Sequence, residues 1–245
     1  MAHLFSQAPG GRAGHDAGVN GRAEALLDDL GVPDGHPLRP LLLGQLRGSR
    51  PLAAFLAAHA AKVRRKLRVP DPEALADVGA ELAVAAWLLR ERRWTLTFEP
   101  LAASGGRSPD FRVAALDGSG AWFVEVTRLR DPAAHLPLRL ARVLAGKAGQ
   151  GPPGAVTVLA VLLPVAEPGA PLLAEALGLL ARASQASEGG PAGVDGRRFA
   201  RERARLSGVL LSSVQSGEFA GQLYPLSGAR HPVPDGVARR LRALG

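Results

Sequence analysis

Residues 108–128 read SPDFRVAALDGSGAWFVEVTR, in which two apolar runs flank an Asp-Gly turn. An Asp-Gly pair between runs rich in β-branched and aromatic residues is a strong signal for a β-hairpin. Residues 111–116 and 121–127 are therefore predicted to be two antiparallel strands. This hairpin is the expected centre of the fold.

The expected register of the hairpin follows from its turn. With the turn closed by a pair between Leu116 and Ala121, counting outward places Asp110 opposite Thr127. Side chains alternate between the two faces of a sheet. Asp110, Glu125 and Thr127 are therefore predicted to share one face.

A helix with a carboxylate beside its apolar face is predicted upstream. Residues 73–92 follow two prolines and carry acidic residues in the first turns and arginines at the end, an order that suits the helix dipole. At about 100° per residue, one apolar arc forms from Leu75, Val78, Leu82, Ala85, Ala86 and Leu89. Glu81 projects at the edge of this arc, away from the open solvent face.

The remaining elements are predicted from apolar periodicity and breakers. Strands are expected at 93–99, 155–166 and 209–214, and helices at 136–150, 171–184, 197–206 and 237–244. Residues 1–20 are expected to be a disordered tail, 21–70 a helical accessory segment and 71–245 an α/β domain.

Together, the helix with Glu81, the Pro-Asp pair ending at Asp110 and the Glu-x-Thr beginning at Glu125 resemble the PD-(D/E)XK nuclease superfamily. The resemblance covers roughly residues 74–164. It implies a restriction endonuclease-like core of a helix, a three-stranded antiparallel meander, a second helix and a strand, here with an N-terminal helical extension. By position, Asp110 and Glu125 correspond to catalytic metal ligands, and Glu81 to an outer or second-metal ligand.

The sequence departs from the family pattern at Thr127, where the family has a lysine. The superfamily includes members whose lysine has moved to the next helix, and Lys147 lies in the helix predicted at 136–150. Lys147 is therefore the candidate to assist the attacking water. Without such a replacement, activity would be lost.

A divalent metal is expected because three crowded carboxylates repel one another unless a cation compensates them. Mg²⁺, or Mn²⁺ in its place, takes one or two carboxylates and completes its shell with waters and substrate phosphates. The bound metal activates water and neutralises charge on the scissile phosphate. Substrate contacts are assigned to Thr127, Arg128 and Gln150.

Ordinary structural roles remain open for each of these residues. Pro-Asp is common in turns, and a strand glutamate usually faces solvent. Glu81 and Lys147 are also open to interpretation as solvated charges on helix surfaces.

The composition excludes several other chemistries. The chain has 245 residues and no cysteine, so it has neither disulfides nor thiolate metal ligands. Gly118-x-Gly120 precedes a strand, and Gly146-Lys147 lacks the following Ser or Thr of a phosphate-binding loop. No secretory signal is recognised and the longest apolar run is too short to span a bilayer, so a cytoplasmic protein without a membrane partner is expected.

A net charge of +8 favours a polyanionic partner, for which double-stranded DNA is the natural candidate. Aromatic residues make up only 4% of the chain, so stacking on single-stranded bases is poorly supported. The basic clusters are residues 62–68, Arg128 with Arg130, residues 197–205 and residues 239–242.

The leading hypothesis is metal-dependent hydrolysis of phosphodiester bonds, as in a DNA endonuclease. The alternative is a nuclease-like domain that has lost activity and serves in DNA binding or assembly. A protein-interaction scaffold with incidental acids is a third hypothesis. A homodimer would supply two sites for two strands, but no feature of the sequence marks an interface.

Overall fold

The computed structural model describes residues 13–102, 108–130, 135–164, 169–186, 193–215 and 218–245. The chain divides into two compact units, Met1–Val69 and Pro70–Gly245. Each unit has its own buried leucines and is described separately.

The first unit is helical. Its helices are α1 (Ala13–Asp29), α2 (Arg39–Leu46), α3 (Arg50–Ala58) and α4 (Ala60–Leu67). Residues 13–20, which we expected to be disordered, belong to α1, and the rest of that expected tail lies outside the described residues. Short helices between prolines, as the sequence predicts for residues 21–70, are present.

A buried arginine, the first residue of α2, links this helix to the end of α1. Arg39 donates a hydrogen bond to Asp28 at 2.6 Å and another to the carbonyl of Val32. The hydrogen bond with Asp28 raises the pKa of Arg39. The side chain of Ser49 begins α3 by accepting a hydrogen bond from the amide of Leu52, as an N-cap residue does.

The second unit combines a mixed sheet with flanking helices. Its strands are β1 (Trp94–Phe98), β2 (Phe111–Ala115), β3 (Ala121–Arg128), β4 (Thr157–Leu162), β5 (Gly208–Gln215) and β6 (Glu218–Pro225). Its helices are α5 (Pro72–Leu88), α6 (Leu136–Lys147), α7 (Ala170–Gln185), α8 (Gly196–Glu202) and α9 (Asp235–Leu244), and a 3₁₀ turn, η2 (Arg203–Arg205), follows α8.

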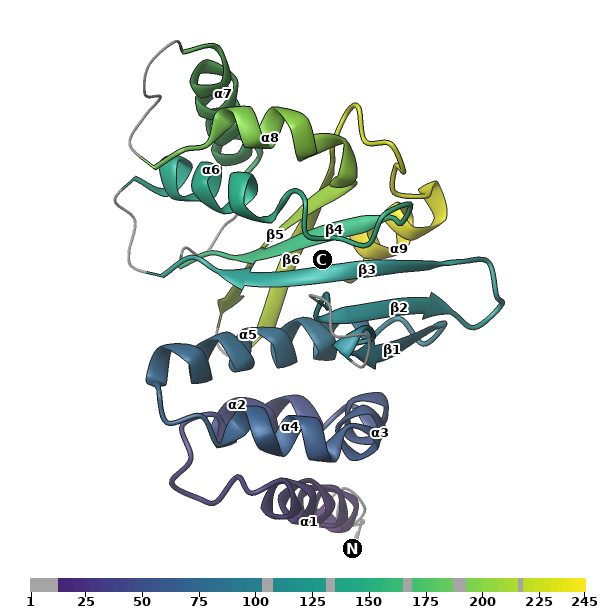
Figure 1. Cartoon of the computed structure of the whole chain (residues 1–245). Coiled ribbons are helices and arrows are strands. Elements are labelled where there is room, and N and C mark those ends of the chain that lie inside the picture. The colour runs from purple at the N-terminus through teal and green to yellow at the C-terminus, as the bar shows by residue number, and fades with distance from the viewer. Residues whose placement is uncertain (1–12, 103–107, 131–134, 165–168, 187–192, 216–217) are drawn as a thin grey trace, which may run out of the picture. The chain divides into compact units, whose positions relative to one another are not determined.

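The six strands lie side by side in chain order, from β1 to β6 (Figure 1). The β1–β2, β2–β3 and β5–β6 pairs are antiparallel, whereas β3–β4 and β4–β5 are parallel. The α/β class predicted from the sequence is confirmed. Strand β3 is the point at which the sheet changes from antiparallel to parallel pairing.

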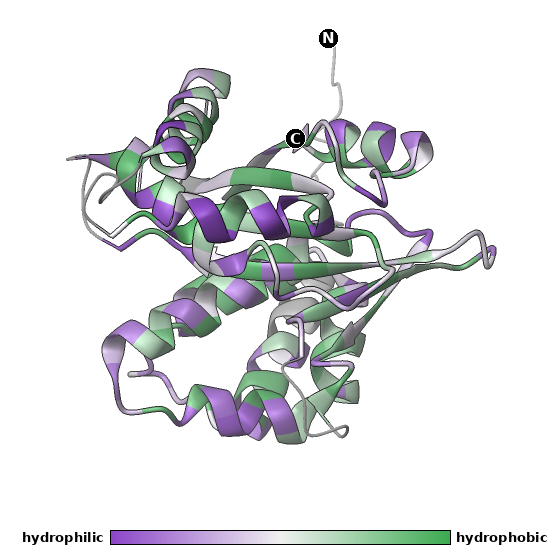
Figure 2. Cartoon of the chain, turned by 45° about the horizontal axis from the view of Figure 1, so that its top comes forward, coloured by the Kyte–Doolittle hydropathy of each residue, from purple (hydrophilic) through white to green (hydrophobic). Residues whose placement is uncertain are grey.

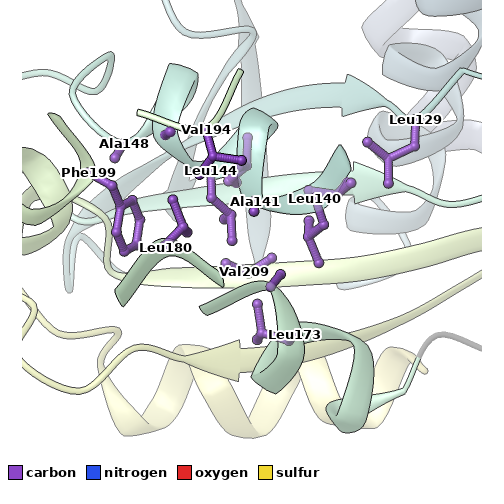
Figure 3. Close-up of a cluster of buried hydrophobic side chains, with 14 of the residues drawn as sticks. Leu129, Leu140, Ala141, Leu144, Ala148, Leu173, Leu180, Val194, Phe199 and Val209 are labelled. Carbon is purple, nitrogen blue, oxygen red and sulfur yellow. The ribbon is translucent and has the colours of Figure 1, made fainter. Parts of the chain in front are cut away.

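Helices cover both faces of the sheet. On one face, α6, α7 and α8 pack on β4 and β5 through a cluster that includes Leu140, Leu144, Val161 and Leu211 (Figure 3). These four side chains are fully buried. The helices show hydrophobic and hydrophilic sides, as expected for elements that cover a sheet (Figure 2).

Helices α5 and α9 lie together on the other face. The indole nitrogen of Trp87 in α5 donates to the carbonyl of Leu244 in α9 at 3.1 Å. The Trp87 ring also lies 5.1 Å, between centroids, from that of Phe219 in β6. The C-terminal helix, which the sequence predicts at residues 237–244, is thus fixed to the domain.

The hairpin forms where the sequence predicts it, with its register shifted by two residues. Phe111 pairs with Val124, and the amide of Ala115 donates to Gly120 at 3.1 Å, which leaves residues 116–119 in the loop. The predicted Leu116–Ala121 and Asp110–Thr127 pairs are therefore wrong. A two-residue shift preserves the faces, so Asp110, Glu125 and Thr127 still occupy positions on the same face.

Several element ends differ from the predictions. Helix α5 ends at Leu88, before the arginines that we placed in its last turn, and begins at Asp71, whose carboxylate accepts from two amides at 3.2 Å. Strand β6 was not predicted. Among the described residues, every helix falls short of the length and apolar character needed to cross a bilayer.

Candidate functional site

A buried ion pair joins strand β3 to helix α6. Glu125 lies within β3 and is 9% exposed. The ammonium nitrogen of Lys147 lies 2.6 Å from Glu125 Oε1. Lys147 is the last residue of α6, and Leu144, one turn earlier, is buried in the cluster over the sheet. The packing of α6 therefore directs Lys147 towards Glu125.

Asp110 is held at the adjacent end of β2. Extending the β2–β3 ladder by one residue places Asp110 opposite Glu125. Its carboxylate oxygen Oδ2 accepts a hydrogen bond from the amide of Val126 at 2.7 Å. The regular ladder stops at Phe111, and beyond it the carboxylate of Asp110, in place of a backbone carbonyl, is the acceptor for the amide of Val126 in β3.

A third acid that the sequence analysis missed lies in the same row. The β1–β2 register, extended by one residue, places Glu99 opposite Asp110, and the amide of Glu99 donates to the carbonyl of Asp110 at 2.8 Å. Glu99 has a positive φ of 44°, which is uncommon for residues other than glycine and occurs often at functional sites. The available signal was a Glu-Pro pair at the end of a predicted strand.

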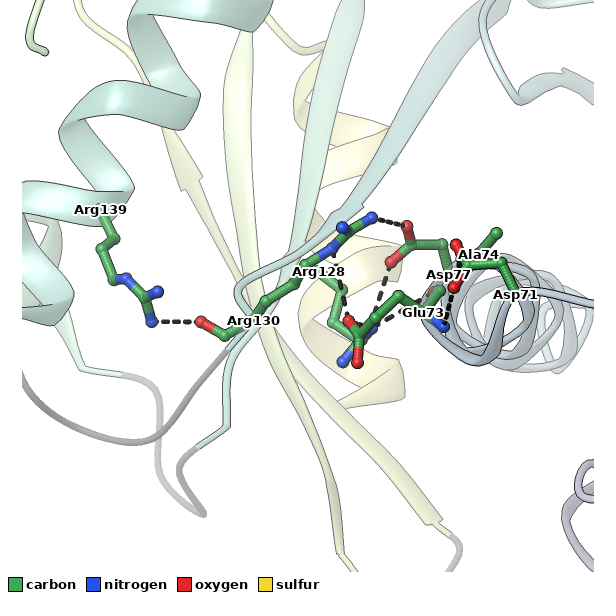
Figure 4. A network of polar contacts seen from close by, with 7 residues as sticks. All are labelled: Asp71, Glu73, Ala74, Asp77, Arg128, Arg130 and Arg139. Carbon is green, nitrogen blue, oxygen red and sulfur yellow. Dashed lines mark hydrogen bonds and ion pairs between the residues drawn. The ribbon is translucent and has the colours of Figure 1, made fainter.

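Arg128 lies on the opposite face of β3 from Glu125 and forms ion pairs with acidic residues of α5. Its guanidinium nitrogens lie 2.7 Å from Glu73 Oε2 and 3.2 Å from Asp77 Oδ1 (Figure 4). Arg130 adds a contact of 2.6 Å to Asp77, and this hydrogen bond raises the pKa of Arg130. The structure thus places Arg128, an expected substrate contact, in an ion-pair network away from Lys147.

Glu81 lies on α5, one turn beyond Asp77, and is half-buried. Helix α5 covers the face opposite α6, so Glu81 does not belong to the row of Asp110 and Glu125. Among the described residues, no group of three or more His, Cys, Asp or Glu side chains is placed to hold a metal ion. The structure brings Lys147 to Glu125 and places Asp110 opposite it in the ladder.

The connection after α6 and the start of β4 each contain a buried polar atom without a partner among the described residues. Gln150 donates from Nε2 to the carbonyl of Gly146 at 2.8 Å, and its Oε1 accepts no hydrogen bond. Thr157 Oγ1 is the second such atom. A Cβ atom on Gly151 would lie 2.3 Å from Thr157 Oγ1, so only glycine permits this close approach.

The sheet is open next to the ion pair. Thr95, Thr97 and Arg112 are exposed and lie on the same face as Glu125. The apolar cluster under α6, α7 and α8 includes residues of β4 and β5 and none of β1 or β2 among the described residues. Thr127, two residues after Glu125, is half-buried. The Glu125–Lys147 pair therefore lies at the border between the covered and the open part of this face.

A separate cavity of about 270 Å³ lies near the hairpin turn. It is lined by Trp94 and Trp122, whose rings meet edge to face at 5.6 Å, and by Arg240 of α9. None of the residues expected to act on substrate lines this cavity. It is therefore distinct from the site at Glu125.

Comparison of the chain with protein-family models, curated protein sequences and solved structures gives no match.

Proposed function

We infer that this protein hydrolyses phosphodiester bonds of nucleic acid, with double-stranded DNA as substrate and Mg²⁺ or Mn²⁺ as cofactor. The observation that carries this proposal is the 2.6 Å contact between Lys147 and Glu125. A lysine on the helix after the hairpin stands where the nuclease superfamily's migrated lysine would. The order α5, antiparallel β1–β2–β3, α6 and β4 supports a restriction endonuclease-like core.

The donor set fits a hard divalent cation. Asp110 and Glu125 supply carboxylates at opposed positions of two strands, and Mg²⁺ needs only one or two of these beside waters and phosphate oxygens. When bound, the metal would lower the pKa of water and neutralise charge on the phosphate.

Glu125, Lys147 and Asp110 each have a separate role beside the metal. Glu125 accepts from Lys147, which fixes the ammonium group beside the carboxylate. From this position Lys147 can orient a water towards phosphorus and stabilise charge that develops on the phosphate oxygens. Asp110 is anchored through Oδ2 by the amide of Val126, which holds its carboxylate at the position opposite Glu125.

The experiment that tests this proposal is cleavage of supercoiled plasmid with Mg²⁺ or Mn²⁺ and an EDTA control. Glu125→Gln keeps the shape of the side chain and removes its charge. Asp110→Asn retains an acceptor for Val126 and also removes the charge. We expect each change to lower cleavage by about a hundredfold or more, a loss usual for one group that stabilises a transition state.

Arg128→Ala is the matched control, because Arg128 lies on the same strand and is ion-paired on the other face. It should leave cleavage within about threefold of the unaltered protein, since exposed ion pairs contribute little. Cleavage that persists in both Glu125→Gln and Asp110→Asn would overturn the assignment of the site.

The second candidate function is an inactive nuclease-like module that binds DNA or serves in assembly. Two observations favour it: Thr127 replaces the strand lysine, and no group of three metal-binding side chains is found among the described residues. It predicts salt-sensitive DNA binding without any metal-dependent product. Specific nicking that requires Glu125 would contradict this alternative.

A further inference from the structure

The structure separates the four basic clusters of the sequence by their surroundings. The arginines at the end of β3 are ion-paired with α5. Residues 239–242 belong to α9, on the face opposite Lys147, and residues 62–68 belong to the other unit. The fourth cluster lies on α8 and η2, which share a face of the sheet with α6. Among the described residues, only this cluster is connected directly to the segment that holds Lys147.

Two arginines of this cluster contact the segment from both sides. Arg198 Nη2 lies 3.5 Å from the carbonyl oxygen of Gly146, and Arg205 Nη2 donates to the carbonyl of Gly151 at 2.7 Å. Lys147 lies between these two carbonyls in the sequence. The buried ring of Phe199 anchors α8 in the apolar cluster. The orientation of α8 relative to the end of α6 is thus fixed.

Arg201 lies on the same side of α8 as Arg198, because it follows Arg198 by three residues within the helix. Arg198 and Arg201 are exposed, and neither has an ion pair among the described residues. Arg205 differs, because Glu202 neutralises it at 3.2 Å. Two uncompensated positive charges therefore stand beside the C-terminal end of α6.

A third exposed arginine lies on the open part of the sheet. Arg112 follows Asp110 by two residues in β2 and pairs with Phe123, so it shares a face with Glu125. In the parallel register, Phe123 is paired with Thr157, beneath Gly151. Arg112, Phe123 and Thr157 thus form one row across the sheet. This row ends beneath Gly151, whose carbonyl is contacted by Arg205.

We propose that Arg112, Arg198 and Arg201 form one phosphate-binding strip that holds the backbone of double-stranded DNA against the Glu125–Lys147 pair. This inference rests on the proposed function and specifies where the substrate is bound. Guanidinium groups bind phosphate oxygens with two parallel hydrogen bonds, which suits a backbone contact independent of sequence. If DNA binds along this strip, neither α9 nor the end of β3 is the principal DNA-binding surface.

The test is binding of a fluorescent duplex of about 20 base pairs, measured by anisotropy in EDTA across a range of NaCl concentrations. Each phosphate contact contributes about one to the slope of log affinity against log salt. Arg201→Ala, which removes no contact within the described structure, should lower the slope by about one and weaken binding several-fold. Arg112→Ala should do the same, and the double variant should lower the slope by about two.

Two controls match these variants. Arg203→Ala changes an exposed arginine that immediately follows α8 and lines a groove against α7 instead. Arg239→Ala changes an exposed arginine of α9. Both should retain the slope of the unaltered protein. Thermal unfolding of each variant shows whether the fold is retained.

The outcomes separate this inference from the function on which it rests. If the unaltered protein binds DNA, and Arg201→Ala and Arg112→Ala bind with the same slope, the strip is overturned and the proposed function stands. If the unaltered protein binds no duplex at any salt concentration, both are overturned. Glu125→Gln should bind DNA with an unchanged slope and fail only in cleavage, which distinguishes loss of chemistry from loss of binding.

Discussion

Strand β3 makes a charged contact on each of its faces, and the two contacts differ in burial. On one face, Glu125 meets Lys147 with side chains that are 12% and 23% exposed. On the other, Arg128 and Arg130 meet Glu73 and Asp77 with side chains that are between 24% and 56% exposed. One contact is a single pair with a buried carboxylate and a half-buried lysine, and the other is a network whose acids are more exposed.

The difference separates two uses of charge. An exposed ion pair loses little hydration when it forms, and it contributes little to the free energy of folding. The role of the network is to orient α5 along the end of β3. A buried pair must overcome the desolvation of both ions and is often no more stabilising than apolar residues of the same size. Stability alone therefore gives a weak reason for placing Glu125 and Lys147 together, whereas a reaction that uses both charges gives a strong one.

The largest effect, on the free energy of unfolding, is expected from the apolar residues by which α6 and α5 pack on the sheet. Leu144→Ala in α6 and Leu82→Ala in α5 each remove a fully buried side chain, and each should lower the free energy of unfolding by about 3 kcal/mol. Urea denaturation measures this loss. Only Leu144→Ala should also reduce plasmid cleavage at a temperature where both variants are folded, because Leu144 is one turn from Lys147. An equal loss of cleavage in Leu82→Ala would contradict this distinction.

The next effect concerns the buried pair itself. A double-mutant cycle of Lys147→Ala and Glu125→Ala should give a coupling energy of about 1–3 kcal/mol, because either single change leaves a buried charge without its partner. The double variant should be more stable than the sum of the single changes predicts. Independent, additive losses would show that the contact does not contribute as a pair.

A smaller coupling is expected for the solvated network. The cycle of Arg128→Ala and Glu73→Ala should give about 0.2–1 kcal/mol at low ionic strength. In about 1 M NaCl this coupling should fall close to zero, since salt screens exposed charges. The coupling of Glu125 with Lys147 should change much less. If salt changes both coupling energies equally, the difference in burial does not explain the difference between the two ion pairs.

The smallest effect is expected at the hairpin turn, outside both contacts. Hydrogen bonds from Ser119 lower the pKa of Asp117 below its usual value of 3.8. A lowered pKa means that the stabilising contribution is present above the unfolded-state pKa and is lost as the pH falls through the folded-state pKa. Asp117→Ala should therefore lower Tm slightly at a pH above the unfolded-state pKa and converge with the unaltered protein as the pH falls below the folded-state pKa. A Tm difference that grows in acid would contradict this sign.

Local sequence patterns predicted the hairpin and the common face of its acids, but not the register. Asp-Gly marks a turn without fixing where it begins: the loop has four residues, as expected, but lies one residue earlier, at 116–119, and this moved the pairing by two residues. Strand β6 was missed because Gly221 and Pro225 weaken its alternating pattern of buried Phe219 and Leu223. The apolar stripe on α5 was also incomplete, because Ala80, Ala83 and Val84 are buried beside it.

The site was predictable only in part. Asp110 and Glu125 share a hairpin, so strand geometry alone placed them on one face. Lys147 is 22 residues from Glu125, and the candidate role for it came from a family resemblance, because no local spacing connects a helix end to a strand. Glu99 was missed because its position in the row depends on the register of a third strand.

The position of Lys147 at the last turn of α6 has a consequence for heat inactivation. Helix ends open more readily than the strands of a central sheet, so the ammonium group can leave Glu125 while the sheet remains intact. On the proposed function, activity should therefore be lost at a lower temperature than ellipticity, and cooling should restore it. Substrate bound across α6 and α8 should narrow the gap between the two midpoints, since a ligand stabilises the state that it binds.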